Sequence, residues 1–89
     1  MLSEIENKIC NHYGVSIEQL RSNDRTSKVC FAKSVLWFFL YNNFGFTAKE
    51  LSEEYNRSIR NIRYSIAKIN FLINKDKDLI KFKQDYINR

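Results

Sequence analysis

Apolar residues recur at helical spacing along most of the chain, and the first such stretch follows a helix-capping sequence. Ser3 and Glu6 have the spacing of a capping box, in which a hydroxyl and a carboxylate satisfy the first free N–H groups of a helix. Ile5 and Ile9 then start a stripe with a spacing of four residues on one helical face. Gly14 can end this helix in a left-handed conformation. The pattern predicts a first helix between Ser3 and Gly14.

The middle of the chain predicts a short helix, a loop and a long buried helix. A second capping box begins at Ser16 and predicts a helix over about 16–22. Residues 23–27 are polar and are expected to form a loop. A helix over about 28–43 follows, and its centre at 35–40 is apolar on all sides, as in a helix surrounded by others. A buried strand is the alternative for this centre, but the segment is long for a strand.

The next segment has the layout of a helix-turn-helix, in which a short helix, a tight turn and a second helix follow one another. A third capping box begins at Thr47, and the helix that it starts is expected to end near Tyr55. Asn56 would form the turn, and a longer helix is predicted over about 57–74. The helix-turn-helix is therefore expected over about 47–74.

Few turn-forming residues interrupt these helices. The chain has no proline and two glycines, Gly14 and Gly45, and the second is expected to end the long central helix. This composition disfavours an all-β fold. With a last helix over about 78–87, the sequence predicts an all-α, compact bundle of about six helices. Its 89 residues are expected to form a single domain, residues 1–89.

The long helix of the predicted helix-turn-helix has two different faces. Its apolar face is a stripe of five isoleucines within an arc of about 80°, which should be buried: Ile59, Ile62, Ile66, Ile69 and Ile73. Its opposite face carries Arg57, Arg60, Asn61, Tyr64 and Lys68, and Arg63 lies at the edge of the apolar stripe. Arginine and asparagine can each form paired hydrogen bonds with base edges in the DNA major groove.

The charge of the chain agrees with an anionic partner. The net charge is +5, and residues 55–69 hold four basic residues and no acid. A solvated helix face and a surface for an acidic protein are the alternatives for this stretch.

Two cysteines, Cys10 and Cys30, lack the spacing of a zinc site and are expected to be buried or inert thiols. Cys10 and His12 alone are a poor metal signal, so no metal or cofactor is predicted.

An enzyme and a membrane protein are disfavoured. One histidine and the lack of a glycine-rich loop leave few groups for catalysis, so no enzyme activity and no small-molecule substrate are expected. The most apolar run, 35–41, is too short to span a bilayer, and charges interrupt the start of the chain. We therefore expect no membrane partner and a cytoplasmic, nucleoid-associated location.

Four stretches in order resemble one known family. They are HYGVSIEQLRSNDRT at 12–26, VCFAKSVLWFFL at 29–40, KELSEEYNRSIRNIRYSIAKI at 49–69 and INKDKDL at 73–79. Together they resemble the C-terminal DNA-binding domain (domain IV) of the replication initiator DnaA, which has a helix-turn-helix of the Trp-repressor class. The resemblance implies a monomer that places its second helix-turn-helix helix in the major groove, while a basic loop reaches the backbone or the adjacent minor groove.

The family positions fall on specific residues of this chain. The loop arginine falls on Arg25, followed by Thr26; a Pro-Arg pair falls on Ala32-Lys33; and the helix-turn-helix arginine falls on Arg57. The base-reading Asp-His-Thr-Thr of the family falls on 58–61, where an isoleucine replaces the histidine and neither threonine remains. A site other than the family's usual box is therefore expected. The family's ATPase domain has no counterpart here, since the chain contains no phosphate-binding Gly-x-x-x-x-Gly-Lys loop.

The sequence thus predicts a module that binds double-stranded DNA, as a small regulator or an accessory replication factor of a bacterium, phage or mobile element. The expected base contacts are Arg60 and Asn61, followed by Ser58 and Tyr64. The expected phosphate or groove contacts are Arg25, Thr26, Lys28, Lys33, Arg57 and Arg63, and the backbone N–H of Thr47 is expected to meet a phosphate. The alternative is a protein-interaction module that kept the fold but lost DNA binding.

Overall fold

The computed structural model describes residues 2–87, and all regular secondary structure in this range is helical. The α-helices are α1 Leu2–Tyr13, α2 Ile17–Arg21, α3 Ser27–Asn43, α4 Ala48–Tyr55, α5 Ile59–Leu72 and α6 Lys77–Phe82, and a π-helical segment Lys83–Ile87 extends α6. The predicted all-α bundle of about six helices is confirmed for these residues. The predicted domain 1–89 also includes Met1, Asn88 and Arg89, which lie outside the described residues.

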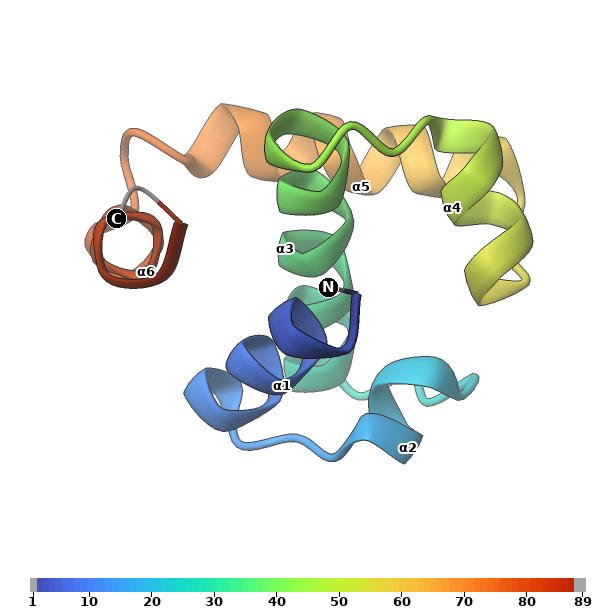
Figure 1. Ribbon diagram of the computed structural model, residues 1–89, viewed down its shortest axis with the longest axis horizontal. Helices are drawn as coiled ribbons and strands as arrows, with labels where there is room; N and C mark the ends of the chain where they lie inside the picture. Colours follow the sequence, from blue (N-terminus) through green and yellow to red (C-terminus); the bar gives the residue numbers. More distant parts are fainter. Residues whose placement is uncertain (1, 88–89) are drawn as a thin grey trace.

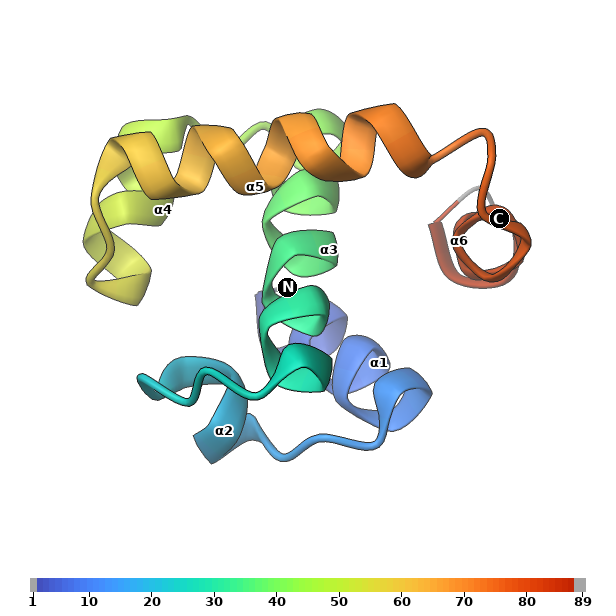
Figure 2. The same cartoon turned by 180° about the vertical axis from the view of Figure 1, so that it is seen from behind.

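Helix α3 lies at the centre of the fold, and the other helices pack around it (Figure 1). Figures 1 and 2 show α1 and α2 against its first half and α5 lying across its far end, with α4 and α6 on opposite sides. All nine residues from 32 to 40 are buried, and Phe39 has no exposed surface. The apolar centre therefore forms a helix that is packed on all sides, as predicted, because α1, α2 and α5 cover its different faces.

The predicted helix ends are mostly confirmed. Ser16 and Thr47 each form the complete capping box, with the side chain of the residue three positions later returning to the cap. Gly14 has φ +68° and Gly45 has φ +78°, so both take the left-handed conformation that ends a helix. The predicted cap at Ser3 is wrong: α1 already begins at Leu2, whose half-buried side chain packs against the core.

Helix α5 is shorter at both ends than predicted. It begins at Ile59 because the Ser58 hydroxyl accepts the Asn61 N–H at 3.1 Å and so caps the helix. It ends at Leu72, and Asp76 then caps α6 by accepting the N–H groups of its first turn. The isoleucine stripe is buried or half-buried over its last four members, whereas Ile59 is 39% exposed.

A buried polar cluster fastens α4 to the first two helices. Glu6 is 3% exposed, and its carboxylate accepts the Tyr55 hydroxyl at 2.7 Å and pairs with Arg21 at 2.8 Å. Arg21 also pairs with Glu54 at 3.0 Å. Burial and the neighbouring Glu6 carboxylate raise the pKa of the Tyr55 phenol, so it remains a neutral donor. The cluster fixes the position of α4, and therefore of the turn that leads into α5.

Candidate nucleic-acid interface

A three-residue turn, 56–58, joins α4 to α5. Asn56 is left-handed, with φ 53° and ψ 53°, and is the non-glycine residue with positive φ in the described chain. Its N–H donates to the Ser52 carbonyl, and the Arg57 N–H donates to the same carbonyl at 3.0 Å. The turn predicted at Asn56 is confirmed, and Arg57 belongs to it rather than to the helix.

Two of the predicted contact residues are turned into the protein. Lys33 is 5% exposed, and its ammonium donates to the carbonyls of Ser22 at 2.7 Å and Asp24 at 3.0 Å. The Arg57 guanidinium donates to Ser22 as well, and to the Tyr55 carbonyl at 3.3 Å. Burial, followed by the nearby Arg57 charge, lowers the pKa of Lys33. The sequence interpretation of both residues as free phosphate contacts does not fit this arrangement, in which they hold the loop before α3.

That loop presents Arg25 to solvent. The Asp24 carboxylate accepts both the backbone N–H of Thr26 at 2.8 Å and its hydroxyl at 2.5 Å. These two bonds lower the pKa of the Asp24 carboxyl, because they favour its charged form. Arg25 lies between these two tethered residues and is exposed. The predicted basic loop is therefore held in place by the Asp24 side chain, and its arginine is exposed.

A cleft of about 520 Å³ separates this loop from the start of α5. Its walls are the loop, α3 and the α4–α5 turn. The lining residues predicted as contacts are Arg25, Lys33, Arg57, Ser58 and Asn61. An adjoining hollow of about 670 Å³ shares Arg25 and Cys30 with this cleft and adds Lys28 and Lys68. The fold thus gathers basic residues from a loop and two helices that are distant in sequence.

Lys68 was missing from the predicted contact residues. It is exposed and lines the hollow with Arg25 and Lys28. Its place on the face of α5 opposite the isoleucines was visible in the sequence, but its proximity to the loop was not.

Of the two cysteines, Cys10 is buried as expected, and its pKa is raised mainly by that burial. Cys30 is exposed and lines both cavities, so of the two expected alternatives, a buried or an inert thiol, the buried one does not apply to it.

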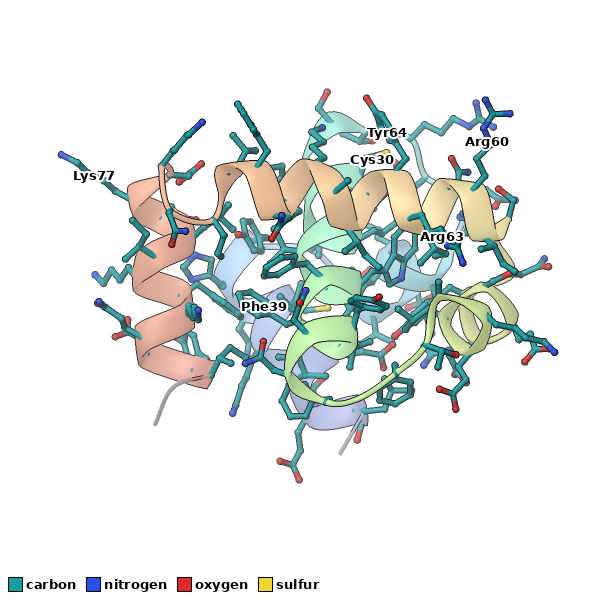
Figure 3. The ribbon with its side chains drawn as sticks, turned by 90° about the horizontal axis from the view of Figure 1, so that it is seen from above. Cys30, Phe39, Arg60, Arg63, Tyr64 and Lys77 are labelled. Atoms are coloured by element: carbon teal, nitrogen blue, oxygen red, sulfur yellow. The ribbon has the colours of Figure 1, made fainter. Side chains whose placement is uncertain are left out.

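The remaining predicted residues divide between the two sides of α5. In Figure 3, Arg60 and Tyr64 project from the side of α5 away from α4, and Arg63 lies on the side facing α4. Tyr64 is 72% exposed. Arg63 lines a third groove, of about 660 Å³, together with Ile59, Thr47 and Lys49. Arg60 is therefore exposed on the outer face of α5, and Arg63 on its flank.

The backbone N–H of Thr47, which the sequence predicts to meet a phosphate, is already bonded within the protein. This N–H donates to the Glu50 carboxylate at 2.9 Å as part of the capping box, so it is not free to meet a phosphate.

Within residues 2–87, no three side chains of His, Cys, Asp or Glu gather in a way that could hold a metal ion. Over the same residues, no helix combines the length and apolar character that a bilayer crossing requires.

The fold and the interface define a small all-α module whose short fourth helix turns tightly into a longer fifth helix that carries exposed cations. No family model matches the chain. Over 86 residues it is 28% identical to the chromosomal replication initiator protein DnaA of Pseudothermotoga lettingae. The match covers 97% of this chain and 19% of the initiator, so the chain spans about a fifth of that relative's length. The resemblance to the C-terminal domain of DnaA, which the sequence motifs indicated, is confirmed.

Proposed function

We propose that this chain binds duplex DNA with α4 and α5 acting as a helix-turn-helix. One observation carries the proposal: exposed Arg25, Lys28, Arg60 and Lys68 gather along the loop before α3, the first turn of α3 and the outer face of α5. The chain has no acidic residue from 55 to 75, so the cations of α5 have no acidic neighbour within their own helix. Such a surface supports binding to a phosphate backbone.

The docking geometry follows from the lengths of the elements. An α-helix rises 1.5 Å per residue, so the 14 residues of α5 extend about 21 Å, which is nearly four turns. The second helix of a helix-turn-helix contacts base edges with its N-terminal residues, so in the proposed docking the first two turns of α5 lie in the groove. We infer that Arg60 and Asn61 then meet base edges, with Tyr64 nearby, while Ser58 serves as the helix cap.

The flanks of α5 supply the backbone contacts. Arg25 and Lys28 lie on one side and Lys49 and Arg63 on the other, so phosphates of both strands have cations within reach. Lys33 and Arg57 act indirectly, since they hold the loop that carries Arg25. The role we infer is that of a small regulator or accessory replication factor, because the relative is named a replication initiator.

A salt titration of duplex binding tests this function. Log affinity should fall linearly with log salt concentration, by about 0.9 for each phosphate contacted. Arg25→Ala should reduce that slope by about one, whereas Lys81→Ala, an exposed lysine on α6, should leave it unchanged. If the chain shows no duplex binding at roughly 50 mM salt, the proposal fails.

A second candidate, protein interaction, is favoured by the groove on the other flank. Tyr41 is 47% exposed and Ile59 39% exposed, and both line this groove of about 660 Å³ with Phe46. Exposed apolar side chains around a groove are typical of surfaces that bind proteins. Two results together would favour this second function. The unaltered chain would show no duplex binding, and a complex with a protein would persist after Arg25→Ala and Arg60→Ala.

A further inference from the structure

Two exposed aromatic side chains lie among the cations of α5. Tyr64 is 72% exposed and Phe71 is 66% exposed, and within residues 2–87 no other large apolar side chain is more than half exposed. At about 100° per residue, four side chains fall within an arc of about 80°. This outer stripe of α5 consists of Arg60, Tyr64, Lys68 and Phe71.

The outer stripe does not contribute to the core. Ile62 and Ile69, on the opposite face of α5, have no exposed surface and make the contact with the rest of the fold. The Lys75 ammonium, just beyond the end of α5, lies 3.6 Å from the centre of the Phe71 ring. This cation–π contact sets a positive charge over one face of the ring, while the Phe71 residue as a whole remains 66% exposed. Folding therefore leaves most of Phe71 exposed to solvent.

Duplex docking does not use Phe71. Helix-turn-helix proteins contact base edges with the first turns of the second helix. Phe71 follows Arg60 by about 16 Å along the helix axis, which is about three helical turns. Phe71 and Lys75 therefore lie well beyond the turns that contact base edges when α5 docks as proposed. The inference below depends on the proposed function only for this orientation of α5.

The chemistry of the outer stripe fits an unpaired nucleic-acid strand. Proteins that bind single strands combine a cationic track for the backbone with aromatic side chains on which bases stack. Tyr64 and Phe71 are about 10 Å apart along the helix axis, and Lys68 lies between them. Lys68 also joins the track to the hollow lined by Arg25 and Lys28, whose lining contains no acid. We propose that the outer stripe of α5 binds an unpaired DNA strand, with bases stacked on Tyr64 and Phe71 and phosphates on Lys68 and Lys75.

A comparison of two oligonucleotides tests the stacking without any substitution. The full chain is titrated with a 12-nucleotide oligothymidylate and with an abasic oligomer of the same length, a length within the range of known single-strand sites. Both carry the same phosphates, but only the first carries bases. The oligothymidylate should bind at least about fivefold more tightly. Equal affinity for the two oligomers would overturn the inference.

Substitutions then locate the site. Phe71→Ala should weaken oligothymidylate binding at least about fivefold, and Phe71→Tyr, which keeps a ring, should stay within about twofold of the unaltered chain. Phe44→Ala removes an exposed aromatic that lies outside the three cavities and serves as the control, with no expected effect. Duplex affinity should be unchanged in Phe71→Ala. If Phe44→Ala weakens strand binding as much as Phe71→Ala, the site does not lie on the outer stripe.

The same measurements separate the two proposals. Duplex binding without oligothymidylate binding would overturn the single-strand site and keep the proposed function. Oligothymidylate binding that depends on Phe71, without duplex binding, would overturn the proposed function and keep the single-strand site. An equal loss of both on Phe71→Ala would show that Phe71 belongs to the duplex surface, which also overturns the single-strand site.

Discussion

Lys33→Met tests whether the buried lysine supports the loop or contacts DNA. Methionine keeps much of the apolar stem and removes the ammonium, which donates to the carbonyls of Ser22 at 2.7 Å and Asp24 at 3.0 Å. A hydrogen bond from a charged group contributes about 1.5–3 kcal/mol, but the burial that lowers the Lys33 pKa marks an opposing desolvation cost. We expect a net loss of about 1–3 kcal/mol in the free energy of unfolding.

Thermal unfolding measures this loss, because each kcal/mol lowers the Tm of a domain of this size by about 4–8 °C. Lys33→Met should therefore unfold roughly 5–20 °C below the unaltered chain. At a temperature where both are folded, the salt dependence of duplex binding should keep its slope. Lys68→Met, which alters an exposed lysine of the same surface, should show the reverse: unchanged Tm and a slope reduced by about 0.9. Unchanged Tm with a reduced slope in Lys33→Met would refute the supporting role.

Three further predictions follow from particular contacts. Tyr55→Phe should lower the free energy of unfolding by about 1–3 kcal/mol, measured by urea denaturation, because the buried Glu6 carboxylate loses a donor. Asn56→Gly should leave stability nearly unchanged while Asn56→Ala lowers it by about 1 kcal/mol, since the turn requires a left-handed residue. Arg60→Ala should relax the base preference seen after in vitro selection of bound duplexes, whereas Arg25→Ala should weaken all duplexes about equally; the opposite result would exchange their proposed roles.

The local rules of helix formation predict most of the fold. Capping boxes at Ser16 and Thr47, and glycines at 14 and 45, set four helix ends, and each depends on residues within three or four positions of one another. The burial of α3 also follows from a local signal, because a segment that is apolar on every side must be surrounded. These features needed no knowledge of how distant segments pack.

The interface was harder to predict because long-range contacts decide which cations are exposed. Lys33 and Arg57 bind the carbonyl of Ser22, which is 11 residues from the first and 35 from the second. Glu6 and Tyr55 are 49 residues apart and still share a hydrogen bond. No periodicity in the sequence encodes such pairings. The helical wheel also treated Arg57 as part of α5, whereas the cap at Ser58 excludes it from the helix.

The basic residues of the interface therefore form an inner and an outer set with different tasks. The inner set consists of Lys33 and Arg57, which donate hydrogen bonds to backbone carbonyls of the loop before α3. The repulsion between their two positive charges is offset because both donate to carbonyl oxygens, which carry partial negative charge. This arrangement frees Arg25, held between Asp24 and Thr26, to face outward beside α5. A count of basic residues overestimates the number of phosphate contacts for this reason. The salt slope of duplex binding should accordingly be set by the outer cations, and removal of either inner cation should appear first as a loss of stability.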